Sequence, residues 1–122
     1  MTRASASTVL ILRVAYGVAL IAAPGRLTLR WLGDGAGDAP VQIPLRGLGA
    51  REAILHTGAL IALRNGRALR PWLAASIAGD LTDVVATAAG RRRLPPGSPL
   101  ATLAVGGGSA LITLLIAGAV EE

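Results

Sequence analysis

Apolar residues fill four long segments of this 122-residue chain, and short polar stretches separate them. The segments cover residues 5–23, 44–63, 71–89 and 99–120. Each is close to the ~20 residues that a helix needs to cross roughly 30 Å of hydrocarbon. Three of them open with proline, which fits the first turn of a helix because its missing N–H would be unsatisfied there anyway. The pattern predicts an all-α fold, a bundle of four transmembrane helices that forms a single domain over residues 1–122.

The polar connections carry further expectations. Residues 24–32 combine arginines with leucines and Trp31, a pattern typical of an amphipathic stretch at a membrane interface. Residues 33–40 are rich in glycine and aspartate and predict a mobile loop. Residues 64–67 and 91–97 predict tight turns at opposite ends of the bundle. A soluble four-helix protein is the alternative, but none of the four apolar segments carries the charged face that it would need.

The first apolar segment has some features of a cleaved signal peptide. Arg13 interrupts it, however, and Pro24 follows it where a small-residue cleavage site would be expected. We therefore predict that this segment is a retained transmembrane helix.

Composition supports the membrane interpretation and excludes several kinds of site. Charged residues make up 16% of the chain, below the roughly one quarter that is usual in soluble domains. The lack of cysteine excludes disulfides, thiolate metal sites and cysteine nucleophiles. The net charge of +5 comes from arginines that mostly flank the apolar segments, and only 2% of residues are aromatic, which leaves little for base stacking. We expect a multi-pass protein of a bacterial plasma (inner) membrane, with the lipid bilayer and no nucleic acid as its partner.

Six ionisable residues interrupt the apolar segments, where charge is costly and is normally paired within a bundle. They are Arg13, Arg51, Glu52, His56, Asp80 and Asp83. On three helices the polar residues lie three or four positions apart and so share a face: Arg13 with Tyr16, Glu52 with His56, and Asp80 with Asp83. At about 1.5 Å per residue, all six fall within a slab of roughly 9 Å near the middle of the bilayer. These seven residues therefore predict one buried polar network.

The depth of each residue predicts the pairs. Arg51 should pair with Asp83 in one layer of the bundle. Arg13 should pair with Asp80 in the next layer. Two arginines then face three carboxylates, so that one acid remains for proton-transfer chemistry beside His56. The candidate catalytic residues are Glu52, His56, Asp80 and Asp83.

Three interpretations of this network stay open, and with them the question of whether the protein is an enzyme. The network can lock the helices together in a non-catalytic accessory protein that binds a second copy or another membrane protein. It can form an embedded site, of isomerase or transferase type, that moves protons on a lipid or isoprenoid-like substrate. It can also form a transport or proton pathway.

We expect neither a metal ion nor a cofactor. Arg13 and Arg51 would compete with a metal ion for the same carboxylates. Gly106, Gly107 and Gly108 are followed by no lysine and lie in an apolar helix, so they do not form a phosphate loop. They instead predict a flexible point in the fourth helix.

Several short motifs carry a family resemblance that covers most of the chain apart from the fourth helix. They are Arg13-Val14-Ala15-Tyr16-Gly17, Ala23-Pro24, Trp31-Leu32-Gly33, Gly47-Leu48-Gly49-Ala50-Arg51-Glu52, Arg70-Pro71-Trp72 and Gly79-Asp80-Leu81-Thr82-Asp83. The pattern resembles the DUF4267 type, a group of small bacterial four-helix membrane proteins of unassigned function, and more distantly the DoxX-like proteins. The resemblance implies an integral membrane protein and assigns no catalytic residue.

Overall fold

The computed structural model describes residues 3–120, the side chains of residues 119 and 120 excepted. These residues are almost entirely helical, and no strand occurs among them. The predicted all-α fold is therefore confirmed.

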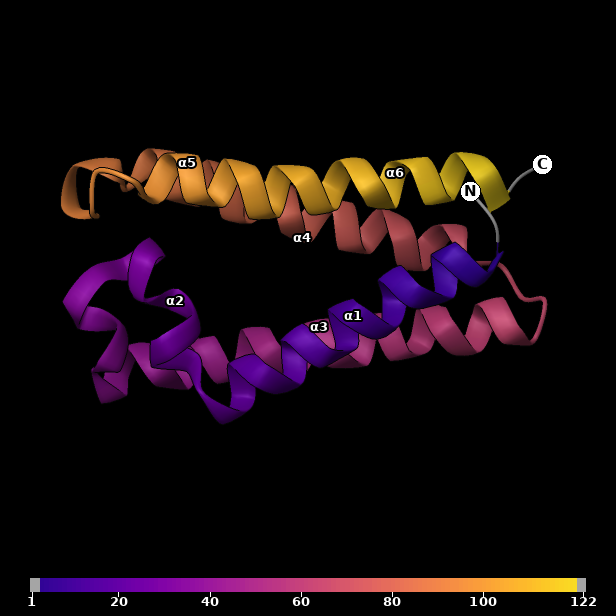
Figure 1. The fold of residues 1–122 in the computed structure, drawn as a ribbon, viewed down its shortest axis with the longest axis horizontal. Helices are drawn as coiled ribbons and strands as arrows, with labels where there is room; N and C mark the ends of the chain where they lie inside the picture. The colour runs from indigo at the N-terminus through magenta and orange to yellow at the C-terminus, as the bar shows by residue number, and fades with distance from the viewer. Residues whose placement is uncertain (1–2, 121–122) are drawn as a thin grey trace.

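The helical elements follow one another with short connections. In chain order they are α1 (Arg3–Ala22), α2 (Pro24–Leu32), the 3₁₀ segment η1 (Gly33–Gly37), α3 (Ala39–Arg64), α4 (Arg70–Ala89), the 3₁₀ segment η2 (Arg91–Arg93), α5 (Ser98–Thr102), the π-helical segment η3 (Leu103–Gly107) and α6 (Gly108–Val120). The last three continue directly into one another, so that α5, η3 and α6 form one long rod (Figure 1).

The long helices lie side by side in two pairs, as Figure 1 shows. In one pair α1 packs along α3, and in the other α4 packs along α6. The α1–α3 contact is close because glycines face each other across it. A Cβ atom placed on Gly49 would lie 2.6 Å from the carbonyl oxygen of Gly17. Small residues at such crossings let transmembrane helices approach at backbone distance.

An apolar core fills the half of the molecule near the α3–α4 turn. Its buried members are Ala6, Leu10, Ala59, Ala62, Leu63, Leu69, Leu73 and Ile116. Toward the other end, the two helix pairs separate and α2 with η1 lies beside them (Figure 1). The polar residues of the site lie in this second half.

The predicted start of the second long helix at Pro44 is wrong, because α3 begins at Ala39. Pro40 occupies the first turn, where the N–H groups of Val41 and Gln42 both donate to the carbonyl of Asp38 at 3.0 Å. Pro44 therefore lies inside the helix and offers no N–H to the preceding turn. Two prolines four residues apart give the same start signal, and the sequence pattern does not choose between them.

The predicted loop at residues 33–40 is also more ordered than expected. Residues Gly33–Gly37 form η1, and Ala36 is fully buried. A Cβ atom on Gly25 would lie 3.3 Å from the carbonyl oxygen of Ala36, so this glycine lets α2 and η1 pack closely. The glycines that indicated a mobile loop lie in a short helical turn packed against α2.

Two segments of the described chain are long and apolar enough to cross a membrane, Arg3–Ala22 and Ser98–Gly118. They correspond to α1 and to the α5–η3–α6 rod. The structure thus contains two candidate spans within an all-helical fold. The prediction of four spans also requires α3 and α4, which carry most of the charges within the bundle.

Candidate functional site

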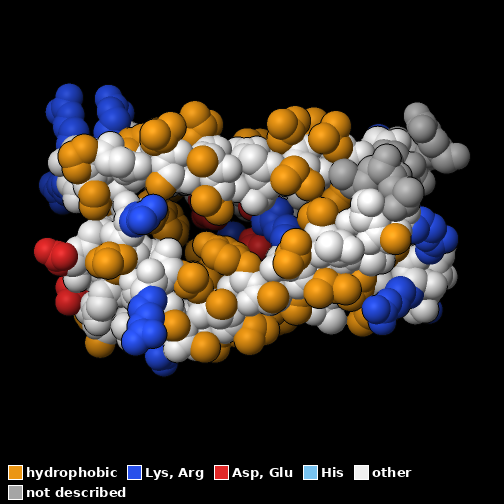
Figure 2. All heavy atoms as spheres, viewed as in Figure 1, with side chains coloured by type: hydrophobic (Ala, Val, Ile, Leu, Met, Phe, Trp, Pro, Cys, Tyr) orange, Lys and Arg blue, Asp and Glu red, His pale blue; other side chains and the backbone are white. Residues whose placement is uncertain are grey.

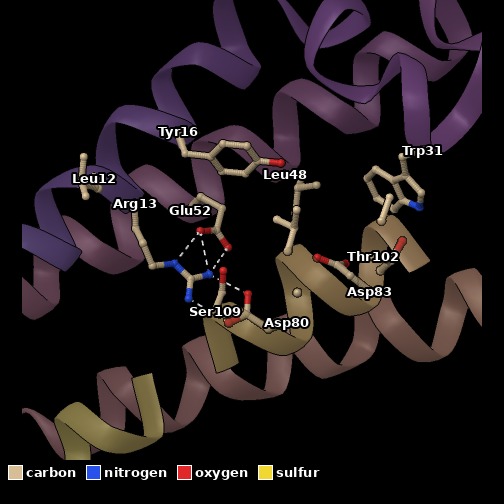
Figure 3. A pocket seen from close by; sticks show the side chains of 13 residues that line it. Leu12, Arg13, Tyr16, Trp31, Leu48, Glu52, Asp80, Asp83, Thr102 and Ser109 are labelled. Carbon is tan, nitrogen blue, oxygen red and sulfur yellow. Dashed lines mark hydrogen bonds and ion pairs between the residues drawn. The ribbon is translucent and has the colours of Figure 1, made fainter. Parts of the chain in front are cut away.

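Arg13 of α1 is the centre of the ionic contacts. Its guanidinium donates to both oxygens of Asp80, over 2.8 Å from Nη1 and 2.6 Å from Nη2. It also donates to the Glu52 carboxylate from Nε and Nη2, over 3.1 to 3.3 Å. A further bond of 3.2 Å joins Nη1 to the hydroxyl of Thr113. One side chain therefore connects α1 with α3, α4 and α6, and Figure 3 shows its bonds to Glu52 and Asp80.

The three charged groups of this centre are buried. The side chain of Arg13 is 12% exposed, and those of Glu52 and Asp80 are each 6% exposed. The sequence predicted the pair of Arg13 with Asp80, and the structure contains it. Glu52 is a second acid on the same guanidinium, which the sequence had left without a partner. Glu52, the acid in excess over arginine, thus shares the Arg13 guanidinium with Asp80.

His56 lies behind Glu52 and is almost fully buried. Its Nδ1 is 2.7 Å from the backbone carbonyl of Glu52, and its Nε2 is 2.8 Å from the Ser76 hydroxyl. A carbonyl oxygen can only accept, so Nδ1 carries a hydrogen. Nδ1 is also 3.4 Å from a carboxylate oxygen of Glu52. His56 therefore adjoins the charged cluster but does not line the pocket described below.

The predictions that Arg51 and Tyr16 are buried are wrong, since Tyr16 is 39% exposed and Arg51 lies at the surface. Arg51 lies 3.8 Å from Asp83, as the predicted pairing requires, but its side chain is 45% exposed and that of Asp83 is 29% exposed. Residue 51 precedes Glu52, and consecutive helical residues point about 100° apart. Because Glu52 faces the interior, Arg51 lies on the flank of α3. It crosses to α4 over Gly79, where a Cβ atom would lie 3.2 Å from its guanidinium.

A pocket of about 290 Å³ opens beside Arg13 between the two helix pairs. Its polar lining comes from Arg13, Tyr16, Glu52, Asp80, Asp83, Thr102 and Ser109, and its other walls from Leu12, Trp31, Leu48, Ala101, Val105 and Gly106. Figure 2 shows the pocket as a hollow in the face between the pairs, with charged atoms visible at its bottom. The pocket thus has apolar walls and an ionic floor.

Two polar groups point into this space without a hydrogen-bond partner among the described residues. Figure 3 shows the hydroxyl of Tyr16 and the carboxylate of Asp83 directed toward the pocket. Within residues 3–120, no hydrogen bond engages either group, and the contact of Asp83 with Arg51 is too long for one. Both groups can therefore bond to a molecule in the pocket.

Trp31, predicted to lie at the membrane interface, also lines the pocket. Its indole N–H donates to the Thr87 hydroxyl at 2.7 Å, and its carbonyl accepts a hydrogen bond from Ser98. These two bonds attach α2 to α4 and α5. Both partners are more than 50 residues away along the chain, with separations of 56 and 67. The sequence around Trp31 therefore contained no signal for this position.

A stripe of hydroxyl residues on the last helical rod was also missed. It consists of Ser98, Thr102, Ser109 and Thr113. Their spacing of four, seven and four places them on one helical face, and this periodicity within an otherwise apolar segment could have identified them. Thr102 and Ser109 line the pocket, and Thr113 bonds to Arg13.

A metal ion has no ready site in this cluster. No group of three or more acidic or histidine side chains within residues 3–120 is arranged to hold one. The Arg13 guanidinium occupies the space between Glu52 and Asp80, where a cation would otherwise bind.

The chain matches no known protein family, no curated protein and no solved structure.

Proposed function

We propose that this protein is a four-helix integral membrane protein of a bacterial plasma membrane, of the DUF4267 type, whose central pocket binds a lipid or isoprenoid-like molecule. The proposal has two parts, the crossing of the membrane by all four long helices and the binding of an amphiphile. Each part has its own support.

An apolar belt around the molecule supports the first part. Large apolar side chains are exposed on the outer faces of α3 and α4 as well as on the two candidate spans. Ile54 of α3 is 71% exposed and Val85 of α4 is 67% exposed. The charges that lower the hydropathy of these helices include Glu52 and Asp80, which face inward. Figure 2 shows apolar side chains over the middle of one face and arginines near both ends, the distribution expected of a protein in a bilayer.

The sideways opening of the pocket carries the second part. The opening lies between α1 and the α5–η3–α6 rod, and Leu12 and Val105, both strongly exposed, border it. In a bilayer this mouth would face hydrocarbon, while Arg13 and its carboxylates form the floor. Ligand pockets commonly combine apolar walls with a few polar groups that fix orientation. An amphiphile could enter with its head toward the charges and its chain toward the lipid.

The pocket favours a binding site over a purely structural lock. A lock requires the Arg13 cluster but no space beside it. Here Asp83 and Tyr16 border the space and lack hydrogen-bond partners within the described chain. These two groups are also the ones through which an isomerase or transferase would exchange protons with a bound substrate.

Native mass spectrometry of the protein extracted from its own membranes tests the proposal. We expect one amphiphile per protein to survive gentle delipidation. The variant Ala101→Phe fills the pocket from α5 and should lose it. Ala104→Phe is the matched control, because Ala104 lies on the same rod but is exposed and does not line the pocket. Equal lipid retention by both variants and the wild type would contradict binding in the pocket.

A further inference from the structure

The charges around the pocket restrict the head group that it can accept, given that the pocket binds an amphiphile as proposed above. Its lining contains three carboxylates and one guanidinium. The guanidinium of Arg13 is engaged by Glu52, Asp80 and Thr113. Turning it toward a phosphate would leave two carboxylates, each 6% exposed, without their cation. Arg13 is therefore not available to an anionic head.

The second arginine, Arg51, does not cancel the excess of carboxylates over guanidinium groups at the pocket. Arg51 is not part of the lining and approaches Asp83 from the flank of α3, at 3.8 Å. The carboxylate of Asp83 still faces the pocket, as Figure 3 shows. Even when Arg51 is counted, three carboxylates face two guanidinium groups, so the surroundings retain an excess negative charge.

Asp80 and Asp83 also do not form a site for magnesium and a diphosphate. A site that held magnesium through both carboxylates, together with the phosphates, would need both of them free for the metal ion. Each carboxylate oxygen of Asp80 accepts a hydrogen bond from Arg13, at 2.8 and 2.6 Å, so the guanidinium occupies the place of a metal ion there. Among the three carboxylates that line the pocket, Asp83 alone accepts no hydrogen bond within the described residues.

We propose that the pocket selects an amphiphile whose head donates hydrogen bonds and carries no negative charge, such as a long-chain amine or alcohol, and rejects phosphate and carboxylate heads. The head would donate to Asp83 and contact the Tyr16 hydroxyl. A phosphate or carboxylate would instead face like charge in a site of low dielectric. The volume of about 290 Å³ is at the lower end for ligand pockets, so it holds a head and the first part of a chain while the rest lies in lipid.

The two tryptophans provide the measurement. Trp31 lines the pocket, whereas Trp72 packs against Gly58, away from it. In the variant Trp72→Phe, fluorescence comes from Trp31 alone. We would titrate this variant, in neutral detergent at neutral pH, with bromine-labelled amphiphiles of one chain length that carry an amine, alcohol, carboxylate or phosphate head. Quenching by bromine would report occupancy of the pocket.

We expect the amine and the alcohol to quench Trp31 saturably, with dissociation constants at least about tenfold below that of the phosphate. Trp31→Phe leaves Trp72 as the reporter and measures quenching by partition into the micelle. The fluorescence quenching of the wild-type protein, after subtraction of the quenching of Trp31→Phe, should equal the quenching of Trp72→Phe. In Asp83→Asn, whose folding is checked by its melting temperature, the preference over phosphate should shrink several-fold.

The outcomes separate the two proposals. If phosphate or carboxylate heads bind as tightly as the amine and alcohol, the inference about the head group is wrong, while binding in the pocket stands. If Asp83→Asn keeps the full preference, Asp83 does not set it and the assignment fails. If no head gives saturable quenching, binding of amphiphiles itself is contradicted.

Discussion

At the scale of single residues, Arg13 and Arg51 show that the contribution of an arginine to stability depends on its position in the fold. Both lie within apolar stretches of sequence and both have acidic neighbours. Arg13 is 12% exposed and bonds to two buried carboxylates, whereas Arg51 is 45% exposed and its acidic neighbours are 3.8 Å or more away. A planar guanidinium can serve two carboxylates at once, which the point charge of a lysine cannot do equally well.

The stability of two matched variants in detergent follows from this difference. Arg13→Leu leaves Glu52 and Asp80 buried without a cation, and breaking a buried pair in this way typically costs ~3–5 kcal/mol. Arg51→Leu removes a half-exposed contact and should cost less than about 1 kcal/mol. Unfolding in increasing denaturant measures both free energies. Arg13→Lys should fall between the two, and equal losses for the two leucine variants would show that Arg13 is not the centre of the cluster.

At the scale of the elements, the sequence predicts which helices exist better than it predicts where they begin or what they contact. The long apolar runs specify α1, α4 and the last rod to within a few residues, because length and hydropathy are local properties. The start of α3 is missed because two prolines compete for one position. The place of Trp31 is missed because hydrogen bonds to remote residues determine it.

In the site, too, the features set by local sequence were predictable and those set by contacts between remote segments were not. The pairing of Arg13 with Asp80 was predictable, since equal depth in the bilayer and opposite charge are both visible in the sequence. The pocket was not, because it depends on how far the two helix pairs separate and on the π-helical turn at Leu103–Gly107 that borders it. That turn occupies part of the glycine-rich region predicted as a flexible point. Glycine permits such a turn, and this turn packs against α4, a contact that the local sequence does not reveal.

The close α1–α3 contact gives a prediction about this pair of helices. In Gly49→Ala the new Cβ atom would lie 2.6 Å from the Gly17 carbonyl oxygen, so the helices must move apart. We expect a clear fall in the melting temperature in detergent. Gly47→Ala is the control on the same helix, because nothing lies within 4 Å of its Cβ position. There the better helix propensity of alanine should leave stability unchanged or raise it by up to about 1 kcal/mol.

Equal effects of the two alanine substitutions would mean that α1 and α3 do not meet at backbone distance. The readout is local to this contact, since neither glycine lines the pocket. The test therefore checks the helix pairing independently of any ligand.

At the scale of the whole molecule, the charged cluster and the apolar belt require each other. Within residues 3–120, only Arg3–Ala22 and Ser98–Gly118 are long and apolar enough to cross a membrane, because the charged residues of α3 and α4 lower the hydropathy of these two helices. In the folded bundle the buried carboxylates of Glu52 and Asp80 are paired with Arg13, and α3 and α4 present exposed apolar side chains such as Ile54 and Val85. Helices that look too polar to cross a bilayer alone could therefore cross it as part of this assembly.

Cysteine labelling decides whether α4 crosses the membrane, and the chain lacks cysteine, so each introduced thiol is unique. The residues Asn65 and Arg92 flank α4, while Val85 lies on its exposed apolar face. We expect Asn65→Cys and Arg92→Cys to react with an impermeant maleimide from opposite sides of sealed vesicles. Val85→Cys should react from neither side until detergent is added, because lipid excludes the water that thiolate formation needs. Labelling of the two flanking sites from one side would mean that α4 does not cross the bilayer, and the pocket would then need another route for its ligand.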